Sequence, residues 1–99
     1  MSMGNLKNSQ TDRLMKALLT LKNEDECYAF LEDLMTIKEL QDLAQRVEVA
    51  ALLRKKITYN EIANKTKVST ATISRVNRCL SYGAGGYEMV LGRLDETND

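Results

Sequence analysis

The segment between Tyr59 and Arg78 constrains the fold more than any other part of the chain. Its sequence, YNEIANKTKVSTATISRVNR, predicts two short helices separated by a tight turn. Thr58 and Glu61 have the spacing of a capping box at the start of the first helix, and Ser69 is a candidate N-cap of the second. We therefore predict a helix-turn-helix motif, whose second helix is of a kind that enters the major groove of DNA.

The predicted helices of the motif each have an inner and an outer face. Ile73 and Val76 lie three residues apart and are expected to face the first helix, while Val68 fills the turn. The other positions of the second helix carry small, polar or basic groups, which suit contacts with phosphates, base edges and thymine methyls. The residues that we predict to contact DNA are Lys65, Lys67, Ser69, Thr70, Ala71, Ser74, Arg75 and Arg78.

The turn of the motif departs from the common pattern at one position. It carries Lys67 where a glycine is frequent. Lys67 must then either adopt a left-handed backbone conformation or belong to a turn of different geometry.

Charge is distributed unevenly along the chain. The formal total is zero, with 14 basic and 14 acidic residues, which argues against an indiscriminate binder of polyanions. Residues 24–48 hold eight acidic and two basic residues, whereas residues 54–78 hold seven basic residues and one acidic residue. The positive segment coincides with the motif and adds Arg54, Lys55 and Lys56 as candidate flanking contacts. A pair of solvated basic helices with no DNA partner is the alternative interpretation.

The rest of the chain also has helical periodicity, and we predict an all-α fold of six helices in one domain. Thr36 and Glu39 make a second capping box, which opens a long helix that runs to about Lys56. The predicted boundaries are a polar tail at residues 1–10, the helical domain at 11–95 with its helix-turn-helix at 59–80, and an acidic tail at 96–99.

Apolar residues recur at helical spacing in the first three predicted helices and mark the faces that we expect to pack. They are Leu14, Ala17, Leu18 and Leu21, then Cys27, Phe30, Leu31 and Leu34, then Leu40, Leu43, Ala44, Val47, Ala50 and Ala51. After Leu80, the glycines of SYGAGGY follow no strand and accompany no phosphate-loop lysine. We interpret them as a hinge or helix cap before a last amphipathic helix.

Several functional classes are disfavoured by what the sequence lacks. No apolar run approaches membrane-spanning length and the first residues hold no signal-peptide core, so we expect a cytoplasmic protein without a membrane partner. Cys27 and Cys79 have no neighbours at metal-ligand spacing, and we interpret both as small buried hydrophobes, with a redox role as the minor alternative. We expect no metal, no cofactor and no catalysis, since the chain has no histidine and no nucleophile beside a base.

Over about residues 11–95 the chain resembles the Trp repressor superfamily and, more narrowly, the TrpR-related YerC/YecD proteins of Gram-positive bacteria. The most specific matches are Thr36 at the start of the long helix, QRVEVAALLR from Gln45 to Arg54, and ATISR from Ala71 to Arg75. The resemblance implies an intertwined homodimer from which two helix-turn-helix motifs project. It also places Arg46 and Arg75 at the two arginines that sandwich the co-repressor indole, and Thr36 at a further pocket position.

Two positions of this candidate effector pocket differ from the repressor. Val76 stands where the repressor has glycine, and Cys79 where it has a serine that contacts the amino acid. A branched side chain takes space from the ring, and a thiol weakens the polar contact, so we predict that L-tryptophan is not a tight ligand. The alternative for the arginines is that Arg46 pairs with Asp42 or Glu48 and that Arg75 contacts only phosphate.

The sequence therefore predicts a dimeric, sequence-specific DNA-binding regulator of transcription, with repression by occlusion as the simpler outcome. Its partners would be double-stranded DNA, a second copy of the chain and a small-molecule effector of unknown identity. A different interpretation is a protein-interaction module, in which the helix-turn-helix fold binds the transcription machinery instead of DNA.

Overall fold

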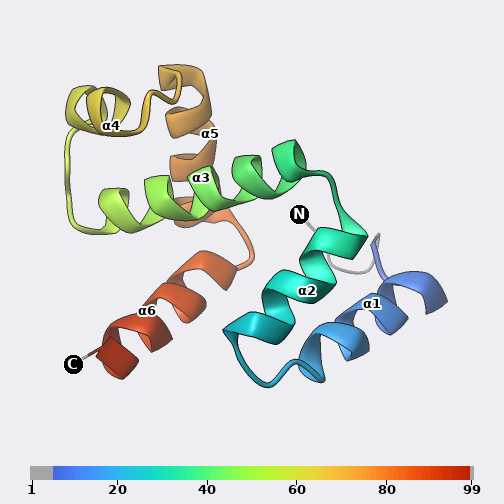
Figure 1. Ribbon diagram of the computed structural model, residues 1–99. Coiled ribbons are helices and arrows are strands. Elements are labelled where there is room, and N and C mark those ends of the chain that lie inside the picture. Colours follow the sequence, from blue (N-terminus) through green and yellow to red (C-terminus); the bar gives the residue numbers. More distant parts are fainter. Residues whose placement is uncertain (1–5, 99) are drawn as a thin grey trace. The chain divides into compact units, whose positions relative to one another are not determined.

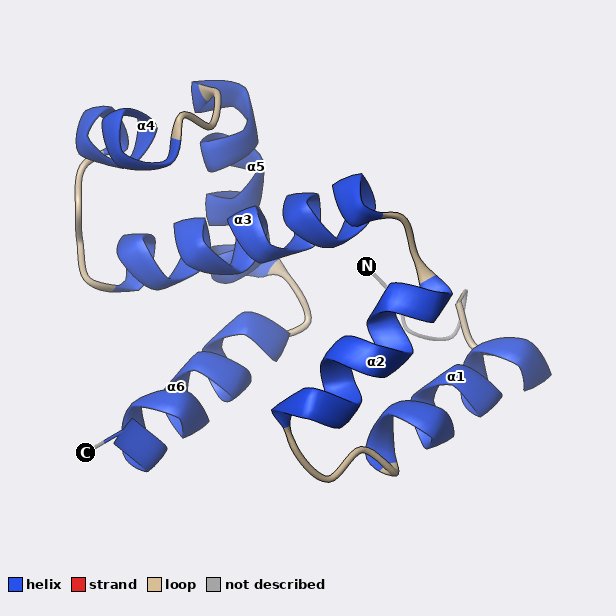
Figure 2. Ribbon diagram, viewed as in Figure 1, coloured by secondary structure: helices blue, strands red, loops and turns tan. Residues whose placement is uncertain are grey.

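The computed structural model describes residues 6–98, and these form six α-helices without a strand (Figures 1 and 2). The helices are α1 (Ser9–Leu19), α2 (Glu24–Leu34), α3 (Ile37–Arg54), α4 (Tyr59–Thr66), α5 (Thr70–Tyr82) and α6 (Gly86–Asn98). The all-α prediction and the expected number of helices are thus confirmed for this part of the chain. The predicted tail residues 1–5 and Asp99 lie outside the described residues.

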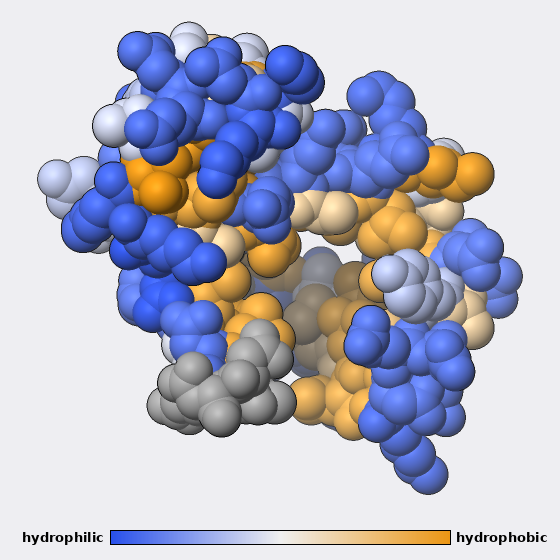
Figure 3. All heavy atoms as spheres, turned by 60° about the vertical axis from the view of Figure 1, so that its left-hand side comes forward, coloured by the Kyte–Doolittle hydropathy of each residue, from blue (hydrophilic) through white to orange (hydrophobic). Residues whose placement is uncertain are grey.

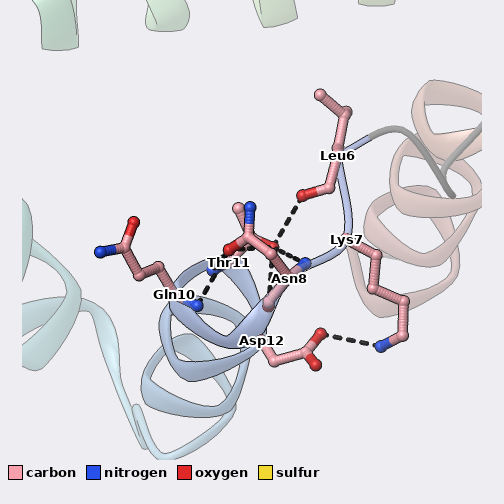
Figure 4. A network of polar contacts seen from close by, with 6 residues as sticks. All are labelled: Leu6, Lys7, Asn8, Gln10, Thr11 and Asp12. Carbon is pink, nitrogen blue, oxygen red and sulfur yellow. Dashed lines mark hydrogen bonds and ion pairs between the residues drawn. The ribbon is translucent and has the colours of Figure 1, made fainter.

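The first helix begins two residues earlier than predicted because of a local cap (Figure 4). The Asn8 Oδ1 accepts hydrogen bonds from the backbone N–H groups of Gln10 and Thr11, each at 2.9 Å. The Asn8 N–H in turn donates to the Thr11 Oγ1 at 2.9 Å, and Lys7 forms an ion pair with Asp12 at 2.8 Å. Asn8 therefore starts α1, although the third helical residue is a threonine and not the glutamate or glutamine of the usual capping box.

The next two helices begin at side-chain caps, and the cap of α3 is the predicted one. Asn23 caps α2 by accepting from the Glu26 N–H at 2.9 Å, and the acidic residues of the first turn suit the positive end of the helix dipole. At α3 both bonds of the predicted capping box are present: Thr36 N–H donates to Glu39 Oε1 at 2.8 Å, and Glu39 N–H donates to Thr36 Oγ1 at 3.1 Å. Side-chain capping thus accounts for both starts.

The chain divides into two compact units, residues 1–40 and residues 41–99. The first unit contains α1, α2 and the first turn of α3, and neither α1 nor α2 has a buried residue. Their apolar stripes are present but only half covered: Leu18 is 37% exposed and Leu34 is 48% exposed. The first unit therefore holds amphipathic helices without a core of its own.

The second unit contains the hydrophobic core. Ile62 of α4, Ile73 of α5 and Val49 of α3 are fully buried, and α5 packs against both α4 and α6. The other buried members of the cluster are Ala50, Leu52, Leu53, Val68, Val76 and Leu91. The inward positions predicted for the motif are thus confirmed. The stripe predicted for α3 is confirmed only in part, because Leu43 and Val47 are 41% and 43% exposed.

The glycines between α5 and α6 act as a helix cap, as predicted. The Gly83 N–H donates to the Cys79 carbonyl at 2.8 Å, and a Cβ at Gly83 would come within 2.3 Å of that same oxygen. Gly85 has a φ of +86°, which L side chains rarely adopt. This segment ends α5 and precedes α6, which starts at Gly86. α6 continues to Asn98, past the boundary at residue 95 that the sequence suggested.

Candidate nucleic-acid interface

The helix-turn-helix is formed by α4, α5 and the turn between them. Thr58 accepts a hydrogen bond from the Glu61 N–H at 3.2 Å, so one of the two bonds of the predicted box is present in the described chain. Ser69 caps α5 by accepting from the Thr72 N–H at 3.2 Å. Lys67 has a φ of 61° and its N–H donates to the Ala63 carbonyl at 2.9 Å. The left-handed alternative for the turn is therefore the correct one.

The outward face of the motif is polar and accessible. In Figure 3 hydrophilic residues cover the end of the second unit that carries α4 and the start of α5. All of the residues predicted to contact DNA are exposed: Lys65, Lys67, Ser69, Thr70, Ala71, Ser74, Arg75 and Arg78. This exposure is what a DNA contact requires, and the contacts themselves stay a prediction.

The exposed residues of α5 fall on two neighbouring faces. Thr70, Ser74 and Arg78 follow one another at intervals of four and form a single outward row. Arg75 lies about 100° from Ser74 around the helix, because each residue turns the α-helix by that angle. Arg75 therefore borders the outward row and also faces a pocket beside α5.

This pocket has a volume of about 460 Å³ and lies within the second unit. Four of the five candidate effector residues line it: Arg46 of α3, with Arg75, Val76 and Cys79 of α5. The fifth, Thr36, belongs to the first unit, where it caps α3, and is not among the residues that line this pocket.

The prediction that both cysteines are buried is wrong for Cys79 and only partly met by Cys27. Cys79 is exposed, whereas Cys27 is half-buried. The buried positions of α5 are Ile73 and Val76, and Cys79 lies three residues after Val76, at the exposed edge of that face. The Cys79 thiol therefore borders the pocket instead of filling the core.

Positive charge dominates the pocket. Arg46, Lys67 and Arg75 line it, and Asp42 is the single carboxylate beside them. Asp42 already has an interaction of its own. The alternative in which Arg46 pairs with Asp42 or Glu48 is not seen, since no ion pair joins them within residues 6–98.

Two further lining residues were not identified from the sequence. Gln45 lies next to Arg46 on α3, and Tyr87 comes from α6. Gln45 stands inside the matched segment that ends at Arg54, so its position next to Arg46 was the available signal. For Tyr87 no local pattern could have placed this residue of α6 beside the pocket.

Arg54, one of the candidate flanking contacts, is paired within the chain. Its Nε lies 2.8 Å from Glu88 Oε1, and its Nη1 lies 2.8 Å from Asp95 Oδ2, so Arg54 joins the end of α3 to α6. The hydrogen bonds to Asp95 and then to Glu88 raise the pKa of the Arg54 guanidinium above its usual value. Arg54 is therefore engaged within the chain, and Lys55 and Lys56 are the basic residues left exposed beside it.

The described residues were also searched for metal sites and membrane-spanning helices. No group of three or more histidine, cysteine, aspartate or glutamate side chains among them could hold a metal ion. None of the described helices combines the length and apolar character needed to cross a membrane.

The sequence and the fold were compared with those of known proteins. Residues 9–95 match the family described as Trp repressor protein. The chain is 52% identical over 97 residues to the uncharacterized protein YerC of Bacillus subtilis (strain 168). The aligned segment covers 98% of this chain and 93% of that protein.

Two crystal structures share the fold. One, a TrpR-like protein from Eubacterium eligens ATCC 27750, is 52% identical with a TM-score of 0.89 and covers 93% of this chain and 95% of that chain. The other, a Trp repressor candidate from Staphylococcus aureus, is 43% identical with a TM-score of 0.91 and covers 96% of this chain and 95% of that chain. Both the sequence match and the structural match span nearly the whole chain, and the protein therefore belongs to the Trp repressor family.

Proposed function

We propose that the protein is a sequence-specific DNA-binding regulator that acts as a homodimer on a pseudo-palindromic operator. The observation that carries the proposal is the outward row of α5, which is exposed, free of acidic residues and placed on a well-packed helix-turn-helix. Membership in the Trp repressor family supports the same function. We expect the protein to act in the cytoplasm, where the operator is accessible.

The exposed apolar surface of the helices outside the motif supports a second copy as partner. In the first unit Leu19 is 85% exposed, and Ile37 at the start of α3 is 77% exposed. A unit of about 40 residues rarely folds without a further source of stability. A second copy would cover these faces and would present two motifs, so that each α5 enters one of two successive major grooves about 34–36 Å apart.

The proposed roles divide the contact residues by chemistry. Lys65, Lys67 and Arg78 carry long cationic side chains and would bind phosphates, which fixes the register of the protein. The residues that would read or border base edges are Ser69, Thr70, Ala71, Ser74 and Arg75. Repression would follow from occlusion of the operator.

The pocket beside α5 is the proposed site of an effector. A ligand there would lie next to Lys67 and Arg75 and could favour one geometry of the paired motifs. Val76 and Cys79 line this pocket, and for the steric and polar reasons given above we propose that the effector is not L-tryptophan.

Fluorescence anisotropy with labelled duplexes, titrated against salt, tests the proposal. The wild-type protein should lose affinity linearly in log salt with a slope worth several phosphates. Arg75→Ala and Ser74→Ala should reduce the preference for the selected operator over a random duplex, whereas Lys67→Ala should weaken both and flatten the salt dependence. Equal loss on both duplexes for Arg75→Ala would contradict its role. Negligible duplex affinity of the wild type at physiological salt would instead favour the protein-interaction module.

A further inference from the structure

The backbone of Lys56 is in a conformation that favours glycine. α3 ends in a Schellman motif, in which the Ile57 N–H donates to the Leu52 carbonyl at 3.2 Å and the Lys56 N–H donates to the Leu53 carbonyl at 3.0 Å. Lys56 occupies the left-handed position of this motif, with a φ of 64°. Glycine adopts that conformation without steric strain, so the presence of lysine there indicates a use for its side chain.

Lys56 lines a polar groove between the end of α3 and the C-terminal half of α5, with a volume of about 340 Å³. Asn77 and Ser81 of α5 line the same groove and offer an amide N–H₂ and a hydroxyl as neutral donors. Arg54 and Glu88 also line it, but they form an ion pair with each other at 2.8 Å. Lys56 has no ion pair with any residue of 6–95, the range whose side chains are described, and therefore contributes the net positive charge of the groove.

The groove borders the outward row of α5. Ser81 continues the row of Ser74 and Arg78 toward the end of the helix, seven residues beyond Ser74. Seven residues of α-helix span roughly 10 Å, and the major groove is about 12 Å wide. A helix that places Ser74 against base edges therefore brings Ser81 to the rim of the major groove, where the phosphates lie.

We propose that Lys56, Asn77 and Ser81 together bind one phosphate of the DNA backbone. Asn77 lies about 200° from Arg75 around α5, so this contact would be on the opposite side of the helix from Lys67 and Arg75. The recognition helix would thus be held to the backbone from both sides. The inference rests on the proposed DNA binding and assigns to it an anchor that lies outside the helix-turn-helix segment.

Neighbouring lysines provide a matched comparison. Lys55 has the same charge, is also exposed and precedes Lys56 directly, but it does not line the groove. Lys56→Gln and Lys55→Gln each remove one positive charge and keep a long side chain, and their affinities for the same operator duplex can be measured by anisotropy between 50 and 200 mM salt. Lys56→Gly serves as a further variant, because glycine removes the side chain and relieves the left-handed strain.

Loss of one phosphate contact should reduce the magnitude of the log–log salt slope by about 0.9. The ratio of wild-type to Lys56→Gln affinity should then shrink about 3.5-fold as salt rises from 50 to 200 mM. Lys56→Gly should behave like Lys56→Gln, and Lys55→Gln should keep nearly the wild-type slope.

The outcomes separate this inference from the proposed function. If the wild type shows a steep salt slope but Lys56→Gln and Lys55→Gln lose the same amount, the groove contact is refuted and DNA binding stands. A Lys56→Gly protein that is well folded and keeps the wild-type slope refutes it as well. If the wild type itself shows no salt-dependent affinity for duplex DNA, the proposed function fails, and this inference fails with it.

Discussion

Lys67 offers a substitution that should raise stability and lower DNA affinity at the same time. Its backbone lies at φ 61° and ψ 17°, and the exposed side chain has no ion pair with the side chains described for residues 6–95. A left-handed conformation costs a residue with a Cβ roughly 1–2 kcal/mol. Glycine avoids this cost but loses about 0.5–1 kcal/mol through its greater freedom in the unfolded chain. Lys67→Gly should therefore stabilise the protein by about 0.5–1 kcal/mol.

Thermal unfolding followed by circular dichroism at 222 nm measures this effect. A gain of about 1 kcal/mol raises the Tm of a domain of this size by about 4–8 °C, and half that gain raises it by about half as much. Protein concentration must be kept constant, because the Tm of the proposed dimer would depend on it. In parallel, the loss of one phosphate contact should lower the magnitude of the salt slope of operator binding by about 0.9.

Lys65→Ala is the matched control for Lys67→Gly. Lys65 is also exposed and lies in the same motif, but it is in the regular helix α4, where alanine and lysine have similar helix propensities. Its substitution removes the same charge without relieving strain, so the Tm should change little. The reasoning is refuted if Lys67→Gly melts at or below the wild-type temperature while Lys65→Ala leaves the Tm unchanged.

Three other variants test the core, the α3–α6 contact and the pocket. Ile73→Ala, at a fully buried position, should destabilise by about 2–5 kcal/mol in urea unfolding, and a loss below about 1 kcal/mol would contradict its place in the core. Arg54→Ala should lower the Tm by a constant amount between pH 7 and pH 10, because a raised pKa keeps the guanidinium charged throughout that range and its contribution is lost only at higher pH. A difference that shrinks toward pH 10 would speak against this ion pair. Val76→Gly combined with Cys79→Ser should strengthen the binding of L-tryptophan in calorimetric titrations, and unchanged weak binding would show that these side chains do not limit it.

The sequence predicts the starts of helices well where a side chain alone decides them. Thr36 and Ser69 cap α3 and α5 as expected, because a hydroxyl at the right spacing satisfies the free N–H groups whatever surrounds it. The start of α1 was placed two residues late because Asn8 pairs with Thr11, which lacks the usual signature of a capping box. For Lys67 the sequence left two backbone conformations open, and only the structure chooses between them.

The candidate site was predictable in its chemistry and less so in its geometry. The outward residues of α5 follow from the inward pair Ile73 and Val76, since helical periodicity fixes one face once the other is known. The groove beside Lys56 and the position of Tyr87 depend on how α6 packs against α5. That packing is a tertiary contact, and no local pattern specifies it.

Burial shows most clearly what a helical pattern can and cannot specify. The stripes of α1 and α2 are as regular as the inner face of α5, yet neither of these two helices has a buried residue, whereas Ile73 is fully buried. Periodicity tells which side chains share a face, but the covering surface can come from the same chain or from another molecule. Helices of 11 residues are marginal in water and gain their stability from packing. Leu43 and Val47 of α3 are also exposed, and in the proposed dimer such apolar faces are where a second copy would pack.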